Sequence, residues 1–168
     1  MADAPRLTKP QWERELHTLL PLFGHRNWIV VADSAYPAQS KPGIETIVSG
    51  MGQLEVARKV LDAINASPHV RANIYLDREL AFVPEKDAPG VTAYRKQLDQ
   101  MFGASAKELP HEEIIAKLDQ VSQVFRVFLI KTEMTIPYTT VFFELGCAYW
   151  PADAEDRLRN AMAAAGGK

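Results

Sequence analysis

The apolar run from Trp28 to Ala32 is the feature that most constrains the fold of this 168-residue chain. The run is short and continuous, and it contains three β-branched residues in a row, at positions 29–31. Such a run is typical of a strand that is covered on both faces of a sheet. Asp33 ends the run, and open α/β sheets bind ligands in the crevice beyond the carboxyl ends of their strands. The sequence therefore predicts a central strand with Asp33 at a ligand crevice.

Helix and strand patterns alternate along the rest of the chain. Apolar residues at helical spacing predict helices near residues 11–20, 54–64, 94–102 and 110–121. Short apolar runs predict strands near residues 44–48, 72–76, 125–130 and 140–145. This alternation is typical of a mostly parallel sheet flanked by helices, so we expect a single α/β domain over residues 1–150. Residues 151–168 form an Ala-rich C-terminal extension whose composition favours a terminal helix.

Composition limits the partners that the protein can bind and the cellular compartment in which we expect it. The formal net charge is -2 and the basic residues are scattered, so the sequence shows no electrostatic footprint for nucleic acid or for an anionic membrane. No apolar run approaches the roughly 20 residues that cross a bilayer. Cys147 is the single cysteine, and the first ten residues lack the apolar core of a signal peptide. We therefore expect a cytoplasmic protein that binds neither nucleic acid nor membrane.

Two ionisable residues flank the predicted central strand. His25 precedes it and Asp33 follows it, and histidine is the side chain whose ordinary pKa lies near neutral pH. A histidine and a carboxylate together suit proton transfer. The plainer interpretations are that His25 is a solvated loop residue and that Asp33 caps the next turn.

The same stretch resembles the D-ribose pyranase and L-fucose mutarotase family. Members of that family carry a Gly-His pair, a hydrophobic strand ending in Asp, and a Pro four residues later, which here are Gly24-His25, Asp33 and Pro37. The pattern Asp-x-x-x-Pro-Ala-x-Ser, from Asp33 to Ser40, is especially similar to the fucose mutarotase version.

A second block, residues 130–146, also resembles the family. Family members place a Gly-Glu, then a Tyr-x-Asn, before a last hydrophobic strand; Glu133 and Tyr138 match, whereas Thr132 and Thr140 replace the Gly and the Asn. Ribose pyranases place a histidine at the start of the preceding helix, where this chain has His111. The resemblance implies His25, Asp33 and Tyr138 as catalytic residues. It implies Thr140, Glu133 and His111 as substrate-binding residues.

The function implied by the resemblance is an isomerase that opens and closes the ring of a monosaccharide, by anomeric or pyranose–furanose exchange, without a cofactor. In this hypothesis Asp33 orients His25, His25 shuttles the proton, and Tyr138 donates to a sugar oxygen. The alternative is a non-catalytic protein of the same fold, which binds a monosaccharide or only assembles after losing part of the site at Thr132 and Thr140.

Other chemistries find little support in the sequence. The four histidines are widely spaced and no Cys-x-x-Cys or His-x-x-x-His pattern occurs, so we expect no metal. Gly50-Met51-Gly52 is similar to the start of a dinucleotide-binding turn, but Glu55 occupies the position of the third glycine. An acidic side chain there would repel a pyrophosphate. An aspartyl phosphatase would need a second Asp at the position of Ala35.

We also expect a homo-oligomer. The family resemblance implies a closed ring, often a decamer, with pockets near subunit boundaries. An apolar cluster near the C-terminus favours the same expectation, because we expect its members to lie on an edge strand that needs cover from another chain: Val141, Phe142, Phe143, Tyr149 and Trp150.

Overall fold

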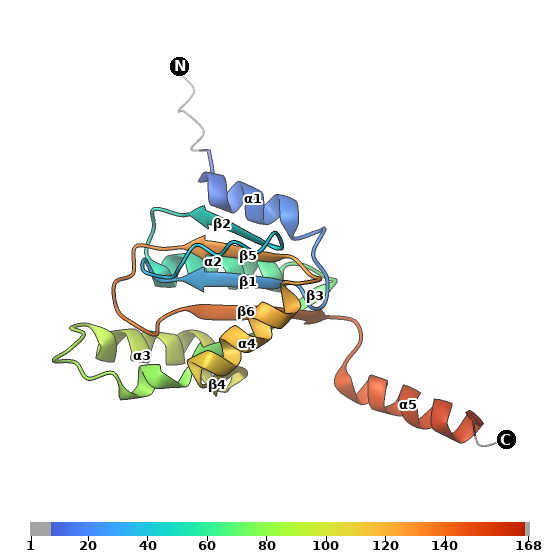
Figure 1. The fold of residues 1–168 in the computed structure, drawn as a ribbon. Helices are drawn as coiled ribbons and strands as arrows, with labels where there is room; N and C mark the ends of the chain where they lie inside the picture. The colour runs from blue at the N-terminus through green and yellow to red at the C-terminus, as the bar shows by residue number, and fades with distance from the viewer. Residues whose placement is uncertain (1–7, 167–168) are drawn as a thin grey trace, which may run out of the picture.

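The computed structural model describes residues 8–166 and confirms the α/β class (Figure 1). The strands are β1 (Trp28–Ala32), β2 (Ile44–Val48), β3 (Val70–Asp77), β4 (Ala106–Leu109), β5 (Val127–Lys131) and β6 (Val141–Cys147). The helices are α1 (Gln11–Leu19), α2 (Gln53–Asn65), α3 (Val91–Phe102), α4 (His111–Val121) and α5 (Ala152–Gly166), with two short 3-10 helices, η1 (Arg78–Phe82) and η2 (Gly103–Ser105).

The six strands form one sheet in the order β2-β5-β1-β6-β3-β4. Strand β5 pairs in parallel with β1 and β2, and β3 pairs in parallel with β4, whereas β6 is antiparallel to both of its neighbours, β1 and β3. The predicted mostly parallel sheet is therefore confirmed, with β6 as the reversed strand. Strand β4 escaped prediction because it is a four-residue edge strand with the sequence AKEL, which has no apolar run.

The central position predicted for β1 is confirmed, because all five of its residues are buried and it lies between β5 and β6. Successive side chains of a strand point to opposite faces. Ile29 and Val31 join a core cluster with α1, α2 and α3, while Trp28, Val30 and Ala32 join another with α4. Figure 1 shows α4 in front of the sheet and α2 behind it. Helices thus cover both faces.

The expectation that the C-terminal apolar cluster lies on an exposed edge strand is wrong. Val141, Phe142 and Phe143 are fully buried, because β6 lies inside the sheet between β1 and β3 and receives a helix on each face. These residues need no second chain to cover them. Tyr149 and Trp150 follow the strand and remain 74% and 43% exposed.

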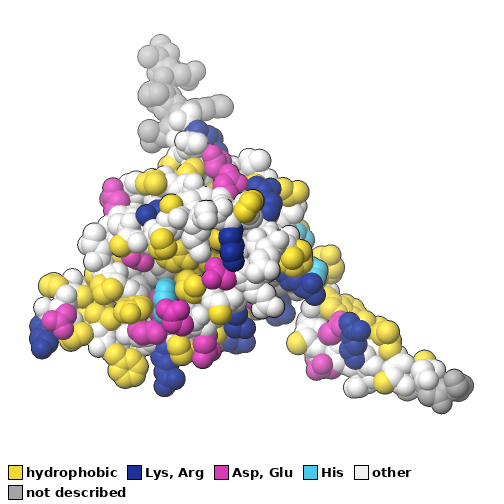
Figure 2. Space-filling model, viewed as in Figure 1, with side chains coloured by type: hydrophobic (Ala, Val, Ile, Leu, Met, Phe, Trp, Pro, Cys, Tyr) yellow, Lys and Arg dark blue, Asp and Glu magenta, His cyan; other side chains and the backbone are white. Residues whose placement is uncertain are grey.

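The predicted terminal helix is confirmed as α5, which buries none of its residues. Figure 1 shows α5 projecting away from the body of the molecule, and Figure 2 shows basic and acidic side chains interspersed on the face in view. Across residues 8–166, no helix combines the length and the apolar character that a membrane span requires.

Candidate functional site

A cavity of about 380 Å³ lies at the carboxyl edge of the sheet. Three strands meet there for a topological reason: β1 and β3 end at this edge, and the antiparallel β6 begins at it. The lining residues come from the segment after β1, the end of β3, the start of α4 and the loop before β6, and they include Asp33, Tyr36, Asp77, His111 and Tyr138. The predicted crevice beyond Asp33 is therefore present as a cavity.

Asp33 is held by Thr140 across the β1–β6 pair. The Thr140 hydroxyl donates to Oδ1 of Asp33 at 2.8 Å, and Thr140 is 2% exposed. The pairing of Val31 with Val141 in the sheet brings the two residues together, since each lies just beyond the paired segment. Thr140, which stands where the family pattern has Asn, thus fixes the direction of the Asp33 carboxylate.

His111 lies on the other side of the cavity and is held at two points. Its Nδ1 lies 3.0 Å from Oδ1 of Asp77, and its backbone N–H donates to the carboxylate of Glu79, with both Oε atoms at 3.0 Å. An acidic partner at the first turn of α4 also suits the helix dipole. The His111 and Tyr138 rings meet edge to face with centroids 5.8 Å apart. The structure therefore brings His111, Tyr138 and Asp33 around one cavity.

Asp77 is a site residue that the sequence reasoning missed. It ends β3 as Asp33 follows β1, so the rule that ligands bind beyond the carboxyl ends of strands was the signal that could have found it. Its side chain is 1% exposed. Burial raises the pKa of the Asp77 carboxyl to about 6, although the hydrogen bond and the charge of His111 act in the opposite direction.

The raised pKa of Asp77 predicts a pH-dependent stability. The folded state binds the Asp77 proton more tightly than the unfolded chain does, so the stabilisation is present below about pH 4 and is lost as the pH rises through about 6. We expect the free energy of unfolding of wild type to fall by roughly 2 kcal/mol from pH 4 to pH 7 relative to Asp77→Asn. Urea unfolding of both proteins across this range measures the difference. Parallel pH profiles would contradict the prediction.

Three buried polar atoms within residues 8–166 lack a hydrogen-bond partner in the protein, and all three belong to residues that line this cavity. They are Oη of Tyr36, Oε1 of Gln39 and Oδ2 of Asp77. Buried polar groups are nearly always paired in folded proteins. The cavity therefore has the unmet polar capacity of a site that receives a polar ligand.

The structure does not bring every predicted residue to the cavity. Glu133 is exposed, does not line the cavity, and uses its backbone N–H on the carbonyl of Met51. Thr132 is buried behind the site, where its hydroxyl lies 2.6 Å from Oε1 of Gln53 and 3.0 Å from the carbonyl of Ala32. The departure from the family pattern at Thr132 therefore has a structural role.

His25 lies at the opposite end of β1 from Asp33. It is exposed in the turn that precedes β1, and the neighbouring Arg26 donates its backbone N–H to the carbonyl of Leu145 near the end of β6. The five-residue strand between them spans roughly 15 Å. Orientation of His25 by Asp33 within one chain is therefore wrong, because the central strand separates the two side chains.

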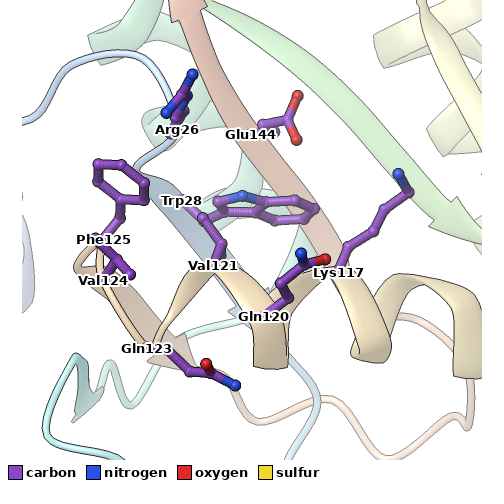
Figure 3. Close-up of a pocket in the computed structure, with 9 residues that line it drawn as sticks. All are labelled: Arg26, Trp28, Lys117, Gln120, Val121, Gln123, Val124, Phe125 and Glu144. Carbon is purple, nitrogen blue, oxygen red and sulfur yellow. The ribbon is translucent and has the colours of Figure 1, made fainter.

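A second hollow, of about 450 Å³, opens at the His25 end of the sheet (Figure 3). In Figure 3 the Trp28 indole lies between Val121 of α4 and Glu144 of β6, with Arg26 near the rim. The Arg26 guanidinium lies over the Phe125 ring at 5.6 Å. This hollow holds none of the predicted site residues and none of the unpaired buried atoms found in the described part of the chain. The cavity at Asp33 is therefore the better candidate site.

The fold and the cavity together define an α/β protein with a cavity of small-ligand size at the carboxyl edge of its sheet. The chain belongs to the RbsD / FucU transport protein family, whose model matches residues 7–148. Helix α5 lies beyond the matched residues. Residues 8–166 hold no group of three or more His, Cys, Asp or Glu side chains arranged for a metal ion.

Solved structures share this fold at low sequence identity. One is Bacillus subtilis RbsD complexed with D-ribose, with a TM-score of 0.55, 19% identity, and coverage of 87% of this chain and 98% of that chain. Another is the fucose mutarotase from Streptococcus pneumoniae in complex with L-fucose, with a TM-score of 0.54, 18% identity, and coverage of 84% and 98%. A third is FucU from Bifidobacterium longum, with a TM-score of 0.53, 18% identity, and coverage of 79% of this chain and 92% of that chain. No curated protein matches the chain.

Proposed function

We propose that this protein catalyses the ring opening and closing of a monosaccharide, by anomeric or pyranose–furanose exchange, through general acid/base catalysis. The observation that carries the proposal is the convergence of Asp33, His111 and Tyr138 on one cavity in a chain of the RbsD / FucU family. Two of the similar structures hold D-ribose and L-fucose, which makes these sugars the first substrates to test.

The reaction requires a proton to leave the anomeric hydroxyl while another reaches the ring oxygen, and reversal of both transfers closes the ring. One general base and one general acid within hydrogen-bond reach of the sugar are sufficient. In our proposal the carboxylate of Asp33, which Thr140 holds in place, accepts a hydrogen bond from a sugar hydroxyl, and the hydroxyl of Tyr138 donates a hydrogen bond to a sugar oxygen. His111 binds the sugar from the α4 side, and His25 moves the proton.

His25 can take part only if a second copy of the chain supplies it. Because His25 and Asp33 lie at opposite ends of β1, the His25 end of one subunit would meet the Asp33 cavity of the next. Such a contact joins two different surfaces, and repeated contacts of this kind close into a ring when the rotation between subunits allows it. We therefore propose a ring-type homo-oligomer with shared sites, and the family resemblance suggests a decamer.

A second candidate function is supported by Thr140. Its hydroxyl is already used on Asp33, whereas an Asn amide at this position would carry a further N–H and a carbonyl for the sugar. A site with fewer donors suits a protein that binds a monosaccharide, or only assembles, without catalysing exchange.

Saturation-transfer NMR on D-ribose and L-fucose separates the two candidates. An enzyme accelerates exchange between the anomers or ring forms at substoichiometric protein concentration. Binding without faster exchange would support the non-catalytic candidate. Absence of both binding and exchange across a panel of aldoses would contradict the enzyme and the sugar-binding protein, and would leave only a protein that assembles.

Thr140→Asn tests whether this position sets sugar affinity. We expect Asn to keep a hydrogen bond to Asp33 and to add amide groups toward the cavity, which changes affinity or preference among aldoses by roughly 3- to 10-fold. Titration calorimetry with a panel of aldoses measures the change. Neither Thr140 nor Thr135 is among the residues that line the cavity, but Thr140 holds the carboxylate of Asp33, which does line it. Thr135→Asn is the control, since Thr135 is exposed. Identical affinities in Thr140→Asn and wild type would show that Thr140 does not influence the ligand.

A further inference from the structure

Tyr36 presents a buried hydroxyl that the protein itself does not satisfy. Tyr36 is 5% exposed and its ring belongs to the core cluster on the α4 face, together with Trp28 and Val30. Phenylalanine would fill the same space without a polar atom. An unpaired buried polar group costs about 1–3 kcal/mol, so the hydroxyl destabilises the protein unless something binds it.

Asp77 leaves a second polar atom free in the same cavity. Its Oδ1 is used on His111, while Oδ2 is buried without a partner in the described chain. Gln39 adds Oε1, a third unpaired acceptor. Burial raises the pKa of the Tyr36 hydroxyl, which keeps it a donor. One donor and two acceptors are therefore presented to whatever occupies the cavity.

The charges around the cavity indicate what kind of group fits. Its lining includes Asp33, Asp77 and Glu112 but no Lys or Arg. A phosphate or a carboxylate on the ligand would meet these three acidic side chains, and the one basic side chain of the lining, His111, is already paired with Asp77. Sugar hydroxyls are neutral, and each accepts hydrogen bonds but donates only one. One hydroxyl can therefore accept from Tyr36 and donate to Oδ2 of Asp77, and a neighbouring hydroxyl of the same sugar can donate to Oε1 of Gln39.

We propose that Tyr36, Gln39 and Asp77 form a hydroxyl-binding subsite, separate from the Asp33–Thr140 pair, that binds a second position of the sugar. This inference rests on the proposed function, because it takes the ligand to be a monosaccharide. Asp77 then has two roles: Oδ1 positions His111, and Oδ2 accepts a hydrogen bond from the sugar. The hydroxyl of Tyr36 serves binding at the expense of the stability of the unliganded protein.

Tyr36→Phe separates these two effects. We expect the ligand-free variant to be as stable as wild type or more stable, and its affinity for the sugar that wild type binds best to fall roughly 3- to 10-fold. Tyr94→Phe is the control for stability, since that hydroxyl donates to the carbonyl of Thr139 at 2.6 Å and its loss should destabilise. Tyr75→Phe is the control for affinity, since Tyr75 does not line the cavity.

Monodeoxy analogues of the bound sugar identify the hydroxyl. One analogue should bind wild type at least as weakly as the parent sugar binds Tyr36→Phe, because it also loses its hydrogen bond to Asp77. The same analogue should bind wild type and Tyr36→Phe equally, because the contact with the Tyr36 hydroxyl is missing in both complexes. Asp77→Asn should weaken binding of the parent sugar by about tenfold or more, since an N–H replaces a carboxylate oxygen. It should also alter the pH profile of exchange, which a purely structural role would leave unchanged.

The outcomes distinguish the subsite from the proposed function. Sugar exchange in wild type with undiminished affinity in Tyr36→Phe would overturn the subsite and leave the proposed function standing. Loss of stability in Tyr36→Phe similar to that in Tyr94→Phe would also overturn it, since the hydroxyl would then be satisfied without a ligand. A wild-type protein that neither binds nor exchanges any aldose would overturn both.

Discussion

We expect replacement of His25 by alanine to lower the proposed sugar exchange by at least roughly 100-fold, the loss that follows removal of a general acid/base. The same change leaves the free energy of unfolding within about 0.5 kcal/mol of wild type, because His25 is exposed in a turn and packs into neither core cluster. Saturation-transfer NMR measures the rate, and urea unfolding measures the stability. Unchanged exchange in the folded variant would remove His25 from the mechanism.

A pair of inactive variants tests whether His25 acts in a neighbouring subunit. His25→Ala and Asp33→Asn should each be inactive alone. When both are coexpressed in equal amounts, about one quarter of the sites in a head-to-tail ring combine an intact His25 with an intact Asp33, so about one quarter of the activity returns. His17→Ala serves as the matched control for His25→Ala, since His17 is exposed on α1. Failure to recover activity in mixed oligomers, or a monomeric mass by light scattering at micromolar concentration, would contradict the shared site.

The largest loss of stability from a single polar substitution is expected at Gln53. Its amide nitrogen donates to the carbonyl oxygens of Val31, at 2.9 Å, and Thr139, at 2.8 Å, and its Oε1 accepts from the hydroxyl of Thr132. Gln53 is 2% exposed, so water does not replace these bonds. Gln53→Leu keeps the approximate size of the side chain and removes all three, which should cost about 3 kcal/mol.

The measurement for Gln53 is urea unfolding of the ligand-free protein at neutral pH. Gln100→Leu on α3 is the matched control, because Gln100 is exposed and the same substitution there should change stability by less than about 0.5 kcal/mol. Gln53 also links β1 to the segment that carries Thr139 and Thr140, so we expect weaker sugar binding in Gln53→Leu as well. Equal stability of the two leucine variants would show that this buried network contributes nothing.

The features that the sequence predicted well are local along the chain. A five-residue apolar run indicated a strand buried on both faces, and the acidic residue that follows it indicated the edge of the sheet at which the cavity lies. The Gly-His, Asp and Tyr motifs indicated the family, and periodic apolar residues indicated the helices. Each of these signals is contained within about 20 residues, and the side-chain periodicity of helices and strands makes such signals readable without tertiary structure.

Only the tertiary structure shows the direction of β6 and which residues line the cavity. The apolar pattern of β6 does not reveal whether the strand lies at the edge or inside the sheet, and its burial between β1 and β3 removed the need for a covering subunit. Asp77 and His111 are 34 residues apart and meet because β3 ends at the same edge at which α4 begins. His25 and Asp33 are only eight residues apart, yet a fully extended strand separates them. The spacing of apolar residues determines which residues are buried, and this spacing can be read from the sequence. Long-range strand pairing determines which polar residues meet, and that pairing is known only once the complete fold is known.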